Sequence, residues 1–231
     1  MSGILYGIGV GPGEPELMTL KALRYIKESD IIILPSEPKE ECYSYRIVQE
    51  VYHEVDEKEI ICLPFPMIKD REFLRKAHDE IYDRISNLLK EGKNVAFLVI
   101  GDPSVYSTYS YIHSRVLSNE GQAYMISGIP SFCAAAAALG ISLGDNTDEI
   151  HIIPGSYEIE QTMKLKGTRI YMKSGKNLAQ LKRLLEESEA DSYEVYSVSN
   201  CGMENEVLTV GLENLNTDSG YLTLVIVKEK S

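Results

Sequence analysis

Apolar strand-like runs alternate with helical segments through the first half of the chain. ILYGIGV is followed by leucines and isoleucines at helical spacing between Glu16 and Glu28, and DIIILP is a second short apolar run. A longer segment from Asp70 to Gly92 carries one apolar stripe and leads into the wholly apolar run NVAFLVI. Because parallel strands are joined by crossovers that are usually helical, this order predicts an α/β fold with a mostly parallel sheet.

The pattern changes after Gly140, where strand-like runs outnumber helices. NLAQLKRLLEES is the one strong helical segment, and the strand candidates are EIHIIPG, TRIYMKS, YEVYSVSNCG, NEVLTVG and YLTLVIVK. This change predicts a second α/β domain with a mixed, strand-rich sheet. The turn-rich segment LSNEGQ marks the boundary, which gives domains of residues 1–118 and 119–231.

The composition excludes several classes of partner. The formal net charge of −12 disfavours a nucleic-acid partner, because a polyanion is repelled by most of such a surface. The four cysteines form no CxxC pair and the four histidines no HExxH motif, so no protein-bound metal is expected. No apolar run approaches the ~18 residues of a membrane span, and no signal-peptide pattern is visible. We therefore expect a cytoplasmic protein without a membrane partner.

The glycine-rich turn YGIGVGPGEPELMT follows the first predicted strand. In the dinucleotide-binding fingerprint G-x-G-x-x-G, Glu14 would occupy the third glycine position and would set a carboxylate against a pyrophosphate. The Walker pattern is also absent. Alternating glycines still let a backbone turn sharply and let a ligand or another strand come close. A tight turn without a ligand remains an open alternative.

Two further turns resemble the first one. IGDPSVY and ISGIPS each follow a predicted strand, and loops at the carboxyl ends of parallel strands converge on one crevice. Asp102 in the first of these turns suits a ligand with positive charge better than a phosphate. The alternative, that Asp102 caps a helix N-terminus, stays open, and both roles are compatible.

Several segments together resemble the tetrapyrrole methylase family: GIGVGPGEPELMTLKALRYIKESDIIILP, GDPSVYSTYSYI, ISGIPSFCAAAAALGISL and HIIPGS. The resemblance covers nearly the whole chain. It implies S-adenosylmethionine as methyl donor, S-adenosylhomocysteine as product, and a homodimer of two-domain chains that hold the donor in an interdomain cleft. The turn GDPSVYSTYSYI is similar to the branch that methylates C20 of precorrin-2, or of its cobalt-containing counterpart, in cobalamin biosynthesis.

The resemblance also implies site residues. Carried over by position, the donor contacts fall on Pro12, Gly101, Asp102, Val105, Pro130, Ser131, Met172, Cys201 and Thr223. The wall of the substrate cleft is expected to include Gly9, Gly11, Gly13, Pro103 and Tyr106. Pro130 has no backbone N–H, so any contact there must use its carbonyl.

Three side chains are candidates for contact with the flat macrocycle. Tyr106, Tyr109 and His113 have the spacing of one helical face, and a tyrosine or histidine is able to accept the proton that leaves C20. The alternative is a helix face packed on the sheet, and no general base is assigned. Because the acceptor carries many carboxylates, we expect a few cationic side chains at the cleft mouth despite the acidic average.

Other functions remain open from the sequence alone. A sister reaction at another tetrapyrrole position, on uroporphyrinogen III or on a later precorrin, uses the same chemistry. A nicotinamide-dependent oxidoreductase is disfavoured by Glu14 and by Pro35 at the end of the second strand. A small-molecule sensor is a third possibility. The sequence leaves open whether the substrate carries cobalt.

Overall fold

The first sheet is parallel throughout, as the strand–helix alternation predicts. In the computed structural model, which describes residues 2–66, 70–155, 157–188 and 192–230, its strand order is β3-β2-β4-β1-β5. The strands are β1 (Ile4–Gly9), β2 (Ile31–Leu34), β3 (Glu59–Cys62), β4 (Val95–Val99) and β5 (Gln122–Ile126). Ser156, the last residue of the HIIPGS segment, lies outside the described residues.

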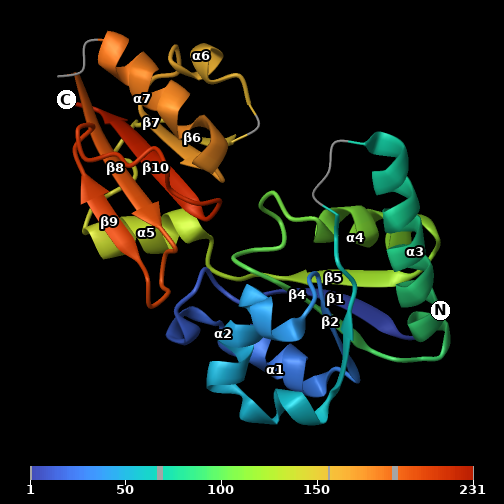
Figure 1. The fold of residues 1–231 in the computed structure, drawn as a ribbon. Coiled ribbons are helices and arrows are strands. Elements are labelled where there is room, and N and C mark those ends of the chain that lie inside the picture. Colours follow the sequence, from blue (N-terminus) through green and yellow to red (C-terminus); the bar gives the residue numbers. More distant parts are fainter. Residues whose placement is uncertain (1, 67–69, 156, 189–191, 231) are drawn as a thin grey trace. The chain divides into compact units, whose positions relative to one another are not determined.

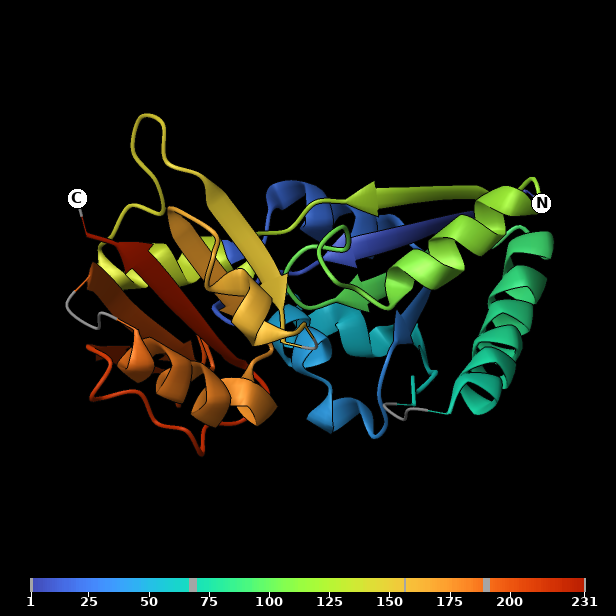
Figure 2. The ribbon, with the colours of Figure 1, turned by 90° about the horizontal axis from the view of Figure 1, so that it is seen from above.

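Helices cover both faces of this sheet, so its strands are apolar on both sides (Figure 1). The helices are α1 (Leu20–Glu28), α2 (Tyr43–Val51), α3 (Arg71–Lys90) and α4 (Tyr109–Ser118). One core cluster joins the sheet to α3 and α4, and the second joins it to α1 and α2. Figure 2 shows α3 and α4 beside one another along the sheet. The predicted helix of 70–92 is confirmed, with Asp70 as its N-cap.

The predicted helix from Glu16 to Glu28 is shorter than its apolar spacing suggests. A 3₁₀ turn occupies Pro15–Leu17, and α1 begins after Thr19, whose side chain accepts a hydrogen bond from the Ala22 N–H at 3.1 Å. This cap turns Leu20 outward, where it is 87% exposed. A capping residue therefore overrides the leucine spacing here.

The second sheet is mixed, with strand order β6-β7-β10-β8-β9. Its strands are β6 (Ile150–Pro154), β7 (Thr168–Met172), β8 (Tyr193–Ser199), β9 (Val207–Val210) and β10 (Thr223–Glu229). All five predicted strands are confirmed. Figure 1 shows α6 (Ile159–Thr162) and α7 (Leu178–Glu187) on one side of this sheet and α5 (Ser131–Leu139) on the other.

The chain divides into two compact units, Met1–Pro130 and Ser131–Ser231. The division comes later than the boundary between residues 118 and 119 that the turn residues suggest. The reason is β5, which pairs in parallel with β1, with Ala123 opposite Leu5. The turn LSNEGQ is therefore a connection inside the first unit, between α4 and β5.

Candidate active site

Three loops come together at the carboxyl edge of the first sheet. They follow β1, β4 and β5, which lie next to one another in the order β4-β1-β5. Gly11 and Gly101 form an isolated antiparallel bridge, in which the Gly101 N–H donates to the Gly11 carbonyl at 2.7 Å. The loops of the YGIGVG and IGDPSVY segments are therefore joined directly through their backbones.

Glycines allow this close approach. A Cβ atom on Gly9 would lie 2.5 Å from the carbonyl oxygen of Gly101 and 2.6 Å from the nitrogen of Gly128. Gly11 and Gly101 adopt φ angles of 86° and 72°, in the left-handed region that favours glycine. Of the two reasons for alternating glycines, the close approach of another backbone segment is confirmed.

Asp102 connects the loop after β4 to the loop after β5. Its Oδ1 accepts hydrogen bonds from the N–H of Ser104 at 2.8 Å and from the Ser104 hydroxyl at 2.5 Å. Its Oδ2 accepts from the N–H of Gly128 at 3.0 Å. Asp102 is only 8% exposed, and both of its carboxylate oxygens accept hydrogen bonds from groups of the first unit. Asp102 caps the turn that it begins rather than helix α4, which starts at Tyr109.

Sequence reasoning missed two residues of this arrangement, Ser104 and Gly128. A signal for Gly128 was present, because ISGIPS places a glycine after a strand as the two other turns do. Its bond to Asp102 spans 26 positions of the chain, and no local pattern encodes such a pairing.

The other predicted residues of the first unit lie on the same loops, with different exposure. Pro12, Gly13 and Pro103 are buried, whereas Val105 and Pro130 are partly exposed. Tyr106 is 44% exposed and has a φ of 45°, which is uncommon for a residue other than glycine. Of the three aromatic candidates, Tyr106 is therefore the most exposed residue.

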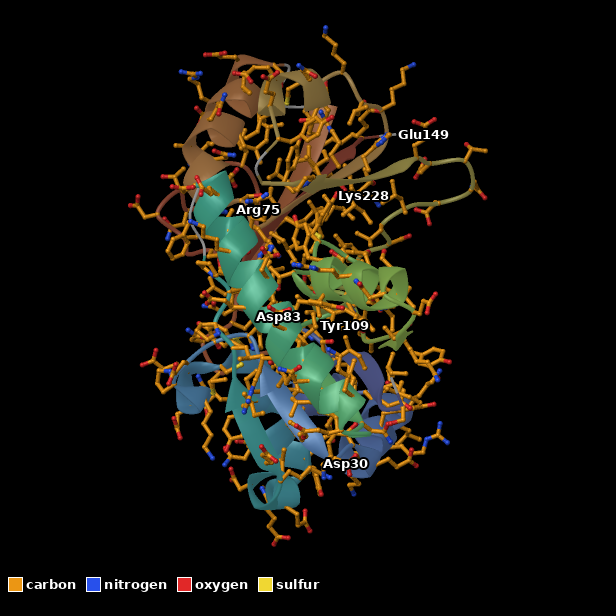
Figure 3. All side chains as sticks on the ribbon, turned by 90° about the vertical axis from the view of Figure 1, so that its right-hand side faces the viewer. Asp30, Arg75, Asp83, Tyr109, Glu149 and Lys228 are labelled. Atoms are coloured by element: carbon orange, nitrogen blue, oxygen red, sulfur yellow. The ribbon has the colours of Figure 1, made fainter. Side chains whose placement is uncertain are left out.

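Tyr109 and His113 lie away from this edge, in the packing of α4. Figure 3 labels Tyr109 beside α3 and α4, and its side chain is 0% exposed. Its hydroxyl donates to the Tyr124 carbonyl at 3.1 Å and lies 3.2 Å from Nδ1 of His113. Burial raises the pKa of Tyr109 and lowers that of His113, so both side chains favour their neutral forms. For these two residues the structure favours packing on the sheet.

The predicted residues of the second unit gather at one edge of its sheet. β6, β7 and β8 end there and the antiparallel β10 begins there. The Thr223 hydroxyl lies 2.9 Å from the Ser199 hydroxyl, and the Cys201 thiol donates to the Ser131 carbonyl at 3.9 Å. Met172, the last residue of β7, completes the group. The structure thus brings together Ser131, Met172, Cys201 and Thr223.

In the described part of the chain, no group of three or more His, Cys, Asp or Glu side chains could hold a metal ion. Across the same residues, no helix is both long and apolar enough to cross a bilayer.

Known proteins are similar to this chain in sequence or in fold. A probable cobalt-precorrin-2 C(20)-methyltransferase of Methanocaldococcus jannaschii is 36% identical, over 97% of this chain and 95% of the relative. A precorrin-2 C(20)-methyltransferase of a Sinorhizobium species is 28% identical, over 98% and 97%. The crystal structure of a Thermus thermophilus uroporphyrin-III C-methyltransferase complexed with S-adenosylhomocysteine has a TM-score of 0.73 at 19% identity, covering 98% of each chain.

A family model agrees with these likenesses. The model for tetrapyrrole (corrin/porphyrin) methylases matches residues 4–215, which include the three loops at the edge of the first sheet and, in the second sheet, the ends of β6, β7 and β8. The 36% identical relative is covered over nearly its full length, so the likeness extends beyond the separate motifs. The chain belongs to the family of tetrapyrrole (corrin/porphyrin) methylases.

Proposed function

We propose that this protein transfers a methyl group from S-adenosylmethionine to C20 of precorrin-2, or of its cobalt-containing counterpart, in cobalamin biosynthesis. The observation that carries the proposal is the likeness, over nearly the whole chain, to two C20-methyltransferases at 36% and 28% identity. The relative of known structure in complex with S-adenosylhomocysteine supports the choice of donor.

The donor site is proposed to use both sheet edges. Its residues are Pro12, Gly101, Asp102, Val105, Pro130, Ser131, Met172, Cys201 and Thr223. Their position at the carboxyl edge of the first sheet and at the corresponding edge of the second supports this set. Because both carboxylate oxygens of Asp102 already accept hydrogen bonds, its part is to hold the loops that present backbone groups to the donor.

The acceptor is proposed to lie against the glycine loops and the ring of Tyr106. Gly9, Gly11, Gly13 and Pro103 supply a wall without long side chains, and Tyr106 is exposed beside them. In the reaction, electrons of the enamine system at C20 form the new bond to the methyl carbon. The sulfonium sulfur keeps the electron pair of the broken bond, and a proton then leaves C20. Alignment of the two reactants provides the main acceleration, worth up to ~7–11 kcal/mol in favourable cases.

A homodimer also belongs to this proposal. The edge strand β9 supports it, because Val207, Leu208 and Val210 are 54%, 42% and 60% exposed. Such an exposed apolar strand at the edge of a sheet favours association with another chain.

The test of the proposed function is methyl transfer with a donor that carries a ¹³C-labelled methyl group. We expect one labelled methyl per precorrin-2, and we expect NMR to place the label on C20. Metal-free and cobalt-loaded acceptors are assayed side by side, with uroporphyrinogen III as the control acceptor. A label at another ring position, or transfer to uroporphyrinogen III alone, would contradict the proposal and favour a sister reaction.

Tyr109→Phe is expected to lower stability and leave turnover unchanged. The variant removes a buried hydroxyl that donates to the Tyr124 carbonyl, and a hydrogen bond of this kind contributes about 1 kcal/mol. Chemical denaturation measures the change in unfolding free energy, with Tyr111→Phe as the control because Tyr111 is 60% exposed. A large loss of kcat at unchanged stability would instead assign the Tyr109 hydroxyl to the reaction.

A further inference from the structure

Lys173 occupies an unusual backbone position at the end of β7. Its φ is 56°, in the left-handed region. This region is disfavoured by roughly 1–2 kcal/mol for residues other than glycine and asparagine. It directly follows Met172 and directly precedes Ser174, whose N–H donates to the carbonyl of Thr223 at 3.2 Å. Lys173 therefore lies between Met172, which belongs to the proposed donor site, and Ser174, which is hydrogen-bonded to Thr223 of the same site.

Tight packing holds the turn in this conformation. The Gly155 N–H donates to the Met172 carbonyl at 2.6 Å, and a Cβ on Gly155 would lie 2.3 Å from the carbonyl oxygen of Lys173. The side-chain amide of Asn177 donates to the Gly155 carbonyl. The loop after β6 and the start of α7 thus fix the backbone of Lys173, so its side chain leaves the sheet edge from a defined point.

The side chain of Lys173 is presented to solvent beside an aromatic ring. Lys173 is exposed, and its ammonium lies 5.7 Å from the centre of the Tyr221 ring, which is 50% exposed. Beside it, the Ser174 hydroxyl is buried and has no hydrogen-bond partner in the described part of the chain. A cation and an unused hydroxyl next to the donor residues form a polar corner suited to an anionic group.

From this arrangement we infer that Lys173 binds a carboxylate of the tetrapyrrole acceptor. The inference rests on the proposed function, because the acceptor is the ligand with several carboxylates around its ring. An acidic chain of net charge −12 needs local cations to hold such a ligand, and Lys173 supplies one where the strands of the second sheet end. Residues held in an unfavourable backbone conformation cluster at binding and active sites, and the positive φ of the charged, exposed Lys173 agrees with a role in binding.

The test compares Lys173→Asn and Lys173→Gly with Lys173→Arg in the full-length protein. Asparagine and glycine both accept a positive φ, so neither variant should lose stability on thermal unfolding. We expect each to raise the KM for the acceptor about tenfold, as for loss of a charge-assisted hydrogen bond. Lys173→Arg keeps the charge and should stay near the wild-type KM. Lys166→Asn removes the same charge from the opposite end of β7 and should change nothing.

The KM values for the two substrates show whether Lys173 binds a carboxylate of the acceptor or the carboxylate of the methyl donor. A rise in the acceptor KM with an unchanged KM for S-adenosylmethionine supports the inference, and added salt should weaken acceptor binding to the wild type more than to Lys173→Asn. A rise confined to the donor KM overturns it and assigns Lys173 to the amino-acid tail of the donor. Unchanged KM values with higher stability overturn it too and leave Lys173 as a turn residue. If the wild-type protein itself does not methylate C20, the proposed function fails. That result differs from the two outcomes above, which overturn only the role of Lys173.

Discussion

Gly9→Ala is expected to lower the unfolding free energy by about 3 kcal/mol and kcat/KM by at least about a hundredfold. The new methyl group would lie 2.5 Å from the Gly101 carbonyl oxygen and 2.6 Å from the Gly128 nitrogen, and both are backbone atoms that cannot rotate away. The loops after β4 and β5 must therefore separate. Since the proposed donor contacts sit on these loops, the reactants lose their alignment.

Gly220→Ala is the matched control. Among the described residues, apart from its two chain neighbours, no heavy atom lies within 4 Å of a Cβ built on Gly220, and the φ of Gly220 is not positive. We expect stability and kcat/KM close to wild type for this variant, measured by chemical denaturation and by steady-state methyl transfer. A Gly9→Ala protein with wild-type kcat/KM would show that the close contact of the three loops is unnecessary for the reaction.

Asp102→Asn is expected to reduce kcat/KM between about ten- and a hundredfold and the unfolding free energy by about 2 kcal/mol. A carboxamide has one acceptor oxygen, so its NH₂ group must face either the donors of Ser104 or the N–H of Gly128. At least one donor is left without its acceptor in either orientation. The loop after β4 or the loop after β5 is then no longer held.

Ser104→Ala provides the comparison for Asp102. It removes one of the three hydrogen bonds to the carboxylate, so we expect a loss near 1 kcal/mol and a small change in kcat/KM. Donor binding, titrated by calorimetry with S-adenosylhomocysteine, should weaken for Asp102→Asn more than for Ser104→Ala. Equal donor affinity in Asp102→Asn and wild type would mean that the loops keep their positions without this carboxylate.

Much of the fold was predictable from the spacing of apolar residues. The stripe of 70–92 and the wholly apolar run after it gave α3 and β4, and the five runs after Gly140 gave the second sheet. Spacing failed where a local hydrogen bond decided the outcome. Thr19 sets the start of α1 and leaves Leu20 exposed, although leucine spacing alone extends the helix to Glu16.

The loops of the candidate site were predictable from the sequence, but the roles of individual residues on them were less so. The glycine turn and the IGDPSVY turn were recognisable because each follows an apolar run. The role of Asp102 depends on Gly128, and the burial of Tyr109 depends on contact with Gly7, where a Cβ would lie 2.1 Å from the tyrosine ring. Both contacts join distant parts of the chain, and spacing along one helix does not encode them.

The hydrogen bond from Gly128 to Asp102 has a mechanical consequence for the connection between the two units. Gly128 is anchored to the first unit, and Ser131 begins α5, where Phe132 and Ala135 are buried in the second. Only the torsions from Gly128 to Ser131 lie outside both anchored regions, and the ring of Pro130 fixes one of them. The connection between the two units is therefore limited to the backbone of Ile129 and Pro130, which leaves it few freely rotating bonds.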